Sequence, residues 1–351
     1  MLVEGLAKIK VEGVFYNPRM KFCRDLDMVI FKLMPGKTYL DSLSATGVRG
    51  IRAKLEAGKE PFFNDISKKA VKVIKENLKI NGIEAKVYCE EAGALMRKEK
   101  FDHVDVDPFG SPAPFIDPAC FSAKKCISFT ATDTAALCGS AVKSCLRKYS
   151  CFVEKVEFYP EVGLRVLAGK IASEATKYDK AVEFFASWAK EHYYRIHVVV
   201  KRSPRLAAKI YENYGYLIYC KKCLYREYIN IENKNNTKSC CPRCGEKLKV
   251  YGPMWLGNMK NAKGDLSKVK KMDVDKKVKE FLIKLNEEID VPFYYNVHEV
   301  CKRLKVSPKP VDEIIEKLKE MGFEASKTVL SGNGIRTNAS IDVVEFLLQK
   351  F

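Results

Sequence analysis

The sequence predicts an α/β fold whose main part is a Rossmann-like, mostly parallel β-sheet. Between residues 37 and 133, short apolar runs alternate with segments that have helical periodicity. The helical segments run for about ten residues or more, which is enough for the right-handed crossovers that join parallel strands. The chain has 351 residues, so it can form two or three domains, each with its own core.

The strands and helices of this region follow one another in a regular order. We expect strands at 38–41, 61–65, 87–89, 102–107 and 126–130, with helices at 47–57 and 67–81 between the first three. Ser67 is a favourable N-cap for the second helix, and Gly82 is a favourable stop at its end. In parallel sheets ligands bind at the carboxyl ends of the strands, and the motifs of interest lie at such ends.

A second block of the chain is expected to complete the same sheet. Its apolar residues Ala175, Ala181, Val182, Phe185 and Ala189 recur at helical spacing and predict a long amphipathic helix from about Ile171 to His192. The strand at 196–201 that follows is expected to pair antiparallel with the sheet. We assign residues 1–255 to this first domain.

The composition excludes several classes of protein. Apolar residues make up 47% of the chain and charged residues 30%, which is ordinary for a soluble globular protein. No apolar run could span a membrane, and the first twenty residues lack the apolar core of a signal peptide. The 13 cysteines are odd in number and thinly spread, which favours reduced thiols and one metal site over disulfides. We therefore expect a cytoplasmic protein with no membrane partner.

The positive charge is concentrated in one part of the chain. The net charge is +18, and residues 201–254 alone hold 12 basic and 4 acidic side chains. Such a segment suits a polyanionic partner such as nucleic acid, and a lysine-rich solvated surface is the alternative.

The ends of the first three strands carry the pattern of a nucleoside site. The turn after the first strand, 41–50, contains Gly47 and Gly50, and Asp65 ends the second strand, where a carboxylate can accept hydrogen bonds from both ribose hydroxyls. The glycine spacing does not match a pyrophosphate cradle, and S-adenosylmethionine needs none. Glu91 and Ala92 follow the third strand and suit the edge of an adenine. Together these strand ends predict a class I methyltransferase sheet, although each acid alone could be a helix cap.

The end of the fourth strand carries the residues expected to act on the substrate. Asp107, Pro108 and Phe109 open a rigid, proline-rich loop. An exocyclic amine on a base is a poor nucleophile because its lone pair is delocalised into the ring. The Asp107 carboxylate and the Pro108 carbonyl can accept both amine hydrogens, while Phe109 stacks on the base. The base would have to leave its stack to reach them. A structural turn with Asp107 as a cap is the alternative.

Several of these stretches together resemble the tRNA guanine-26 N2-dimethyltransferase family in its archaeal form. The resemblance is carried by the following segments: 15–20 (FYNPRM), 23–25 (CRD), 41–52 (DSLSATGVRGIR), 64–67 (NDIS), 107–112 (DPFGSP), 130–133 (TATD), 145–149 (CLRKY) and 251–257 (YGPMWLG). It covers almost the whole chain. It implies transfer of one or two methyl groups from S-adenosylmethionine to the guanine amine at position 26 of tRNA.

The resemblance also implies roles for individual residues. Those with a cofactor role are Arg24, Arg49, Asp65, Glu91 and Ala92. Asp107 is the implied catalytic acceptor, and Phe15 and Phe109 are aromatic residues on either side of the transfer centre, Phe15 on the substrate side. The chain departs from the family pattern in having Cys before Arg24, where Asn is expected, and Glu at position 91, where Asp is expected. Surface ion pairing is the alternative role for the two arginines.

Four cysteines have the spacing of a structural zinc site. Cys220 and Cys223 form one C-x-x-C pair, and Cys241 and Cys244 form another after seventeen intervening residues. Four thiolates close a tetrahedral site and leave no position open to water. We expect a zinc-ribbon insertion at about residues 215–250, with Cys240 outside it, that stiffens loops near tRNA. The alternative is a set of buried cysteines that bind no metal.

The last hundred residues form a separate predicted unit. Residues 256–351 contain a helix at 297–304, a second at 308–321 with Ser307 as its cap, and a hairpin with its turn at 331–334. This pattern is that of a winged-helix-like α+β domain, which we expect to contact tRNA. No obligatory protein partner is evident.

Two other functions remain open from the sequence. The Asp-Pro-Phe loop would also serve a DNA or another RNA amino-methyltransferase. A non-enzymatic zinc-ribbon protein that binds nucleic acid on an inactive sheet is the third reading.

Overall fold

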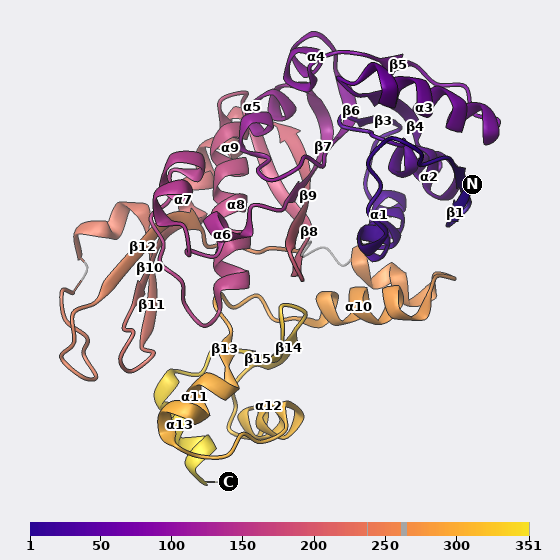
Figure 1. The fold of residues 1–351 in the computed structure, drawn as a ribbon. Helices are drawn as coiled ribbons and strands as arrows, with labels where there is room; N and C mark the ends of the chain where they lie inside the picture. Colours follow the sequence, from indigo (N-terminus) through magenta and orange to yellow (C-terminus); the bar gives the residue numbers. More distant parts are fainter. Residues whose placement is uncertain (237, 261–264, 351) are drawn as a thin grey trace.

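A seven-stranded sheet with helices on both faces forms the upper body of the molecule in a computed structural model (Figure 1). The structure describes residues 1–236, 238–260 and 265–350. The strand order is β5-β4-β3-β6-β7-β9-β8, and the strands are β3 (Thr38–Asp41), β4 (Glu60–Asn64), β5 (Val87–Tyr88), β6 (Phe101–Val106), β7 (Ala123–Ala131), β8 (Lys180–Lys190) and β9 (Tyr193–Arg202). The first five are parallel, and β9 pairs antiparallel with both β7 and β8. The predicted Rossmann-like, mostly parallel sheet is confirmed, and so is the antiparallel strand that completes it.

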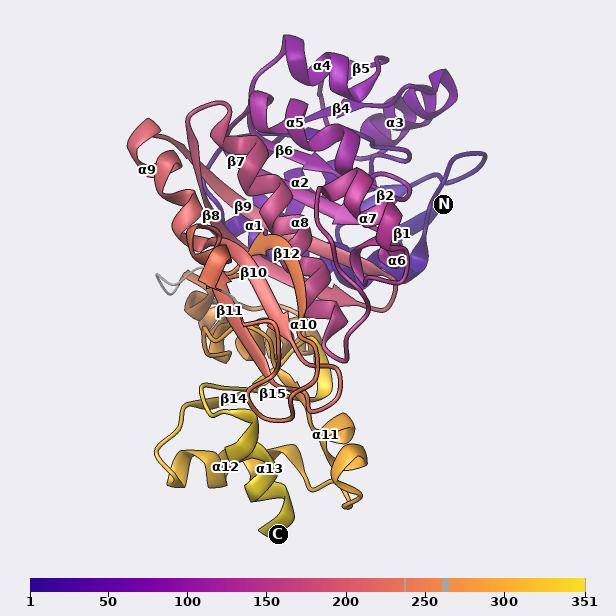
Figure 2. The same cartoon turned by 90° about the vertical axis from the view of Figure 1, so that its left-hand side faces the viewer.

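The helices divide between the two faces of this sheet (Figures 1 and 2). One face carries α1 (Lys21–Leu33), α2 (Val48–Ala57) and α3 (Lys68–Ile80), and the other carries α4 (Ala92–Lys98), α5 (Ala113–Ser122) and α8 (Tyr159–Thr176). The Ser67 hydroxyl caps α3 by accepting the Ala70 amide, and Gly82 has φ +62° just beyond the helix, as predicted. A small hairpin, β1 (Leu2–Glu4) with β2 (Ala7–Ile9), packs beside α2 and α3.

The predicted helix from Ile171 to His192 is wrong. Helix α8 ends at Thr176, and residues 180–190 form the edge strand β8. The neighbours Phe184 and Phe185 are both buried, and they belong to clusters on opposite faces of the sheet. A strand covered on both faces has no clear alternation, so its apolar residues can also fit a helical spacing.

A second, three-stranded sheet lies beside α8, and the four cysteines predicted to bind zinc lie in its connecting segments. Its order is β11-β10-β12, with β10 (Tyr214–Tyr219), β11 (Arg226–Asn230) and β12 (Lys249–Trp255). Three short helices connect the sheets or cover their ends: α6 (Thr134–Leu137), α7 (Val142–Tyr149) and α9 (Pro204–Ala208). Strand β12 packs against α8, which fixes this sheet on the larger one.

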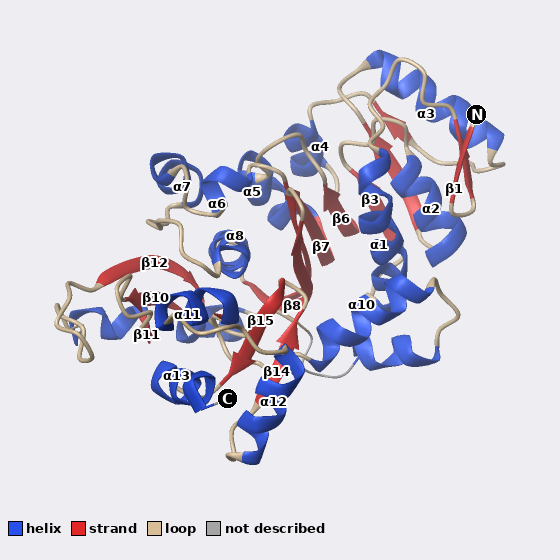
Figure 3. Ribbon diagram, turned by 60° about the horizontal axis from the view of Figure 1, so that its bottom comes forward, coloured by secondary structure: helices blue, strands red, loops and turns tan. Residues whose placement is uncertain are grey.

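The C-terminal part has the helices and hairpin of a winged-helix-like unit (Figure 3). It contains α10 (Lys276–Glu287), β13 (Tyr295–Asn296), α11 (Val297–Leu304), α12 (Val311–Glu320), β14 (Ala325–Thr328), β15 (Ser331–Thr337) and α13 (Ile341–Lys350). Its small sheet has the order β13-β15-β14. The helix at 297–304 matches the prediction.

Two details of this unit differ from the prediction. Helix α12 begins at Val311 and not at Pro308, because Pro310 disfavours helical backbone at the residue before it. The hairpin turn lies at Val329 and Leu330, since Thr328 pairs directly with Ser331, and the predicted turn at 331–334 is part of β15. A side chain at Gly334 would meet Tyr294 and Thr328 within 3 Å, so close packing explains that glycine.

The C-terminal unit joins the large domain through buried charges. Glu161 of α8 accepts hydrogen bonds from the amides of Phe293 and Tyr294, at 2.8 and 3.0 Å. It also accepts a hydrogen bond from Arg336 at 2.9 Å, and Arg165 pairs with it at 2.8 Å. Helix α10 packs on α1, and a boundary between residues 255 and 256 stays a prediction. In the described part of the chain, no helix is both long and apolar enough to cross a membrane.

Candidate active site at the carboxyl edge of the sheet

The loop after β6 is held firmly to the end of β7. The Gly110 amide donates to the Thr132 hydroxyl at 2.8 Å, and the Thr132 amide donates back to the Gly110 carbonyl at 2.8 Å. The Tyr149 hydroxyl is 2.9 Å from Ser111 Oγ and donates to Asp133 at 2.8 Å. The stretches 107–112, 130–133 and 145–149, which are distant in sequence, therefore form one hydrogen-bonded unit.

Two exposed aromatic rings meet at the tip of this loop. Phe109 is 76% exposed and Phe15, from the segment before α1, is 52% exposed. Their ring centroids are 4.4 Å apart with an edge-to-face geometry. Exposed aromatic rings of this size lose water contact when a flat ligand stacks on them. The structure thus brings together the two aromatic residues that the sequence singled out.

The Asp107 carboxylate comes two residues before Phe109 in the same loop and is partly exposed. Its Oδ2 accepts a hydrogen bond from Nη2 of Arg49 on α2. No other hydrogen bond to this carboxylate is found among the described residues, so Oδ1 remains open as an acceptor. Arg49 also pairs with Asp27 of α1 and lies 3.7 Å from Asp105 of β6.

A buried carboxylate lies behind the site at the end of β3. Asp41 accepts a hydrogen bond from the Gly50 amide at 3.0 Å and is buried. Burial and the nearby Asp105 carboxylate raise the pKa of Asp41 to about 8. Asp41 is therefore largely neutral at pH 7, which limits the negative charge of the site.

The predicted nucleoside contacts lie on neighbouring strand ends. Asp65 follows β4, and its two oxygens accept the amides of Ala45 and Ser67, each at 2.9 Å. Each carboxylate oxygen can accept a second hydrogen bond, so Asp65 still fits a ribose. Glu91 caps α4 by accepting the Gly93 and Ala94 amides at 2.9 and 2.7 Å. Ala92 opens that helix and is buried.

The two predicted arginines are both buried in ion pairs. Arg24 Nε donates to Glu4 of the β1–β2 hairpin at 2.7 Å, and its Nη2 donates to the Asn17 carbonyl at 3.1 Å. Burial would raise the pKa of Glu4, but Arg24, together with hydrogen bonds from Tyr16 and Arg52, outweighs burial, and the pKa falls to about 2. Arg24 therefore fixes the segment that carries Phe15. Arg49 is paired with acids, as described above.

The four predicted metal ligands converge at one point. The Sγ atoms of Cys220, Cys223, Cys241 and Cys244 all lie within 4.8 Å of one another. The Leu224 amide donates to the Cys220 carbonyl and the Gly245 amide to the Cys241 carbonyl, so both C-x-x-C pairs form similar turns. Cys240 is exposed and outside the cluster, as predicted. Four thiols in this arrangement fit a tetrahedral zinc ion.

Sequence reasoning missed the acids and the arginine behind Asp107. Asp27 of α1 and Asp105 of β6 are buried, and both accept hydrogen bonds from the buried Arg195 of β9. The only signal in the sequence was Arg195 itself, which lies two residues from His197 inside an apolar strand. A buried arginine requires buried hydrogen-bond acceptors.

The chain matches known proteins along almost its whole length. It matches the N2,N2-dimethylguanosine tRNA methyltransferase family over residues 3–349. It is 50% identical to the tRNA (guanine(26)-N(2))-dimethyltransferase of Archaeoglobus fulgidus, with 99% of this chain and 97% of that protein covered. It is 36% identical to the enzyme of the same name from Methanosarcina acetivorans, with coverages of 99% and 98%. Among solved structures, Trm1 from Pyrococcus horikoshii in complex with S-adenosyl-L-methionine superposes with a TM-score of 0.89 at 34% identity, over 99% of both chains.

Proposed function

The chain belongs to the N2,N2-dimethylguanosine tRNA methyltransferase family, and from that premise we propose how its own residues divide the work of the reaction. It is an S-adenosylmethionine-dependent enzyme that methylates the exocyclic N2 amine of a guanine in tRNA. The names of its relatives support guanine 26 as the target and a dimethylated product, which two successive methyl transfers would give.

We assign Asp107 as the acceptor that prepares the amine. One oxygen of its carboxylate is anchored by Arg49, and the other is open in the loop that carries the exposed Phe109. This open oxygen and the Pro108 carbonyl would accept the two amine hydrogens, which makes the nitrogen lone pair available for attack. The observation that carries the assignment is a carboxylate with one oxygen anchored by Arg49 and the other open, two residues before the exposed Phe109.

Phe15 and Phe109 would hold the target base. A guanine inside a tRNA helix hides its amine, so the base must leave its stack and find a new one in the enzyme. The two exposed rings supply that surface next to Asp107. Their position favours alignment of N2 with the methyl donor.

The cofactor site follows the three strand ends. S-adenosylmethionine supplies an electrophilic methyl group on its sulfonium. Asp65 would bind the ribose hydroxyls with its remaining lone pairs, and Glu91 and Ala92 would lie along the adenine. Arg24 and Arg49 are the other cofactor contacts implied by family resemblance, and each would use the N–H groups left free by its ion pairs.

The four cysteines would hold one structural zinc ion. Their donor set and matched turns support a closed site with no catalytic role. The insertion would then present a stiff loop to the tRNA.

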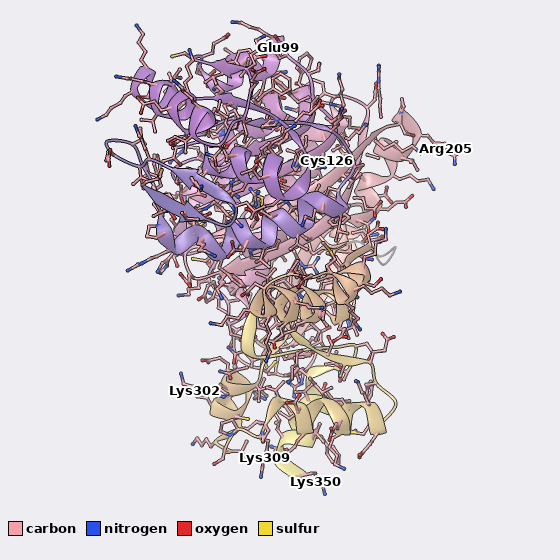
Figure 4. All side chains as sticks on the ribbon, turned by 90° about the vertical axis from the view of Figure 1, so that its right-hand side faces the viewer. Glu99, Cys126, Arg205, Lys302, Lys309 and Lys350 are labelled. Carbon is pink, nitrogen blue, oxygen red and sulfur yellow. The ribbon has the colours of Figure 1, made fainter. Side chains whose placement is uncertain are left out.

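The C-terminal unit is proposed as a second contact for tRNA. Figure 4 shows Lys309 and Lys350 at its outer end and Lys302 on its side, while Arg205 projects from the upper domain. A long polyanion can reach charges spread over such distances. We expect the chain to act without a protein partner and, like its substrate, in the cytoplasm.

Mass spectrometry of nucleosides tests the proposal. Purified protein and S-adenosylmethionine are incubated with a tRNA transcript, with the same transcript carrying adenine at position 26, and with a DNA duplex. Methylated guanosine only in the first sample is the expected result. Methylation of the DNA, or of the transcript without guanine 26, would contradict the proposed target.

A further inference from the structure

Arg195 lies inside the sheet, next to the predicted active site, and has no contact with solvent. It comes from β9, at the level where that strand pairs with the end of β7. Its Nη1 and Nη2 donate to the two oxygens of Asp105 at 2.7 and 2.9 Å. Its Nε donates to Asp27 of α1 at 3.0 Å, and Nη1 also reaches the Thr130 hydroxyl at 3.0 Å. The guanidinium of this β9 residue therefore joins β6, β7 and α1.

The same two acids hold Arg49. Asp27 pairs with Arg49, and Asp105 lies 3.7 Å from its Nε. The remaining end of Arg49 holds Asp107. A continuous series of charges thus leads from Arg195, through Asp27 and Asp105, to Arg49 and the carboxylate at the surface.

The surrounding groups leave these charges little freedom to move. The Tyr39 hydroxyl donates to Asp105 at 2.7 Å, and His197 Nε2 lies 3.1 Å from Asp27. Burial and the Arg195 charge hold the pKa of His197 well below its ordinary value, so this ring is neutral. Two buried arginines then balance two buried aspartates, and the cluster carries no net charge of its own.

Stability alone does not account for such a cluster. Removing an ion from water costs several kcal/mol even after relaxation, and apolar residues of similar volume often stabilise a core as well or better. A buried network does, however, fix its members in one geometry. Asp107 is the member of this series that reaches the surface, so the network fixes the position of its carboxylate.

We propose that Arg195 is a positioning residue for methyl transfer: through Asp27 and Asp105 it fixes Arg49, which holds the Asp107 carboxylate in the orientation that accepts the amine hydrogens. The inference rests on the proposed role of Asp107. It gives Arg49 a positioning role in addition to the cofactor contact implied by the family.

The test separates positioning from folding. Arg195→Met alone leaves two acids with one arginine, so the double variant Arg195→Met/Asp27→Asn is made as well, because it keeps the buried charge balanced. Arg165→Met is the matched control, since Arg165 is equally buried in an ion pair but contacts Glu161, Trp255 and Gly257. Circular dichroism establishes a temperature at which all variants are folded.

Steady-state kinetics with tRNA and S-adenosylmethionine then gives the answer. We expect kcat of the double variant to fall by about 10²-fold, the loss that a misplacement of about 1 Å can cause. KM for tRNA should change less than about threefold, and the control should keep its kcat. Arg195→Lys retains the positive charge but not the planar set of N–H donors of the guanidinium, so its kcat should lie between those of wild type and the double variant.

The outcomes are distinct. A double variant with kcat within twofold of wild type, or a control that loses as much, would overturn the inference. An inactive wild-type enzyme, or an Asp107→Ala variant of normal rate, would instead overturn the proposed function on which it rests.

Discussion

Replacement of Glu161 by glutamine should weaken the junction between the large domain and the C-terminal unit. Its carboxylate is enclosed by two guanidinium groups and two backbone amides. Burial would raise its pKa, but Arg336 and Arg165 outweigh burial and lower it from 4.5 to about 2. A difference of about 2.5 units corresponds to about 3 kcal/mol of stability at neutral pH. Breaking a buried pair by removing one partner costs a similar amount, about 3–5 kcal/mol.

The pH dependence of this effect has a definite sign. The folded-state pKa lies below the unfolded one, so the contribution of Glu161 is complete above about pH 5 and is lost as the pH falls toward 2. The stability difference between wild type and Glu161→Gln should therefore shrink from about 3 kcal/mol at pH 5 to about 1.5 kcal/mol at pH 3.

Urea unfolding followed by tryptophan fluorescence measures this difference. The chain has two tryptophans, and both Trp188 and Trp255 are buried. Glu174→Gln is the matched control, because Glu174 lies on the same helix and pairs with Lys170 and Lys177, whose side chains are 22% and 55% exposed. That variant should lose no more than about 1 kcal/mol. If both variants unfold at the same urea concentration, the argument about the buried junction is refuted.

Other substitutions test the separate parts of the site. Asp107→Ala should slow methyl transfer by about 10²-fold or more with near-normal cofactor affinity, whereas Asp65→Ala should weaken that affinity. Initial rates measure the first effect and calorimetry measures the second. If the two variants show the same rate and the same cofactor affinity, both roles are contradicted. Phe109→Ala should lower kcat/KM for tRNA by about 5- to 150-fold, the equivalent of one lost stacking contact of about 1–3 kcal/mol, and Phe109→Tyr should restore most of it. Elemental analysis should find one zinc ion per chain in wild type and in Cys240→Ala but much less in Cys220→Ala; equal zinc contents would exclude the four-cysteine site.

Strand ends and cysteine spacing made much of the site predictable. Asp65 and Asp107 could be placed together because parallel strands bring their carboxyl ends to one edge, whatever their separation in sequence. The cysteine ligands could be paired because each C-x-x-C turn is local. The helix at 297–304 was likewise predictable, since its capping and periodicity are local signals.

The remaining features depend on contacts between distant segments. Strand β8 was taken for a helix because both of its faces are buried, which removes the alternation that identifies a strand. Arg195 and Asp27 are separated by 168 residues, and nothing local links them. Arg24 matches the family motif, yet its partner Glu4 becomes apparent only when the folded N-terminal hairpin brings Glu4 to it.

The packing of α1 against the later helix α10 limits the order in which the chain can fold during synthesis. The apolar face of α1 shares a buried cluster with Leu266, Val269 and the inner side of α10, and Phe22 packs on Phe281 with ring centroids 5.7 Å apart. A ribosome adding 5–20 residues per second needs roughly 10–50 s to make the intervening chain. During that time the apolar residues of α1 that this cluster encloses lack their cover from α10. The large domain therefore completes its core only after the beginning of the C-terminal unit has emerged, and until then α1 is a site for chaperone binding or aggregation.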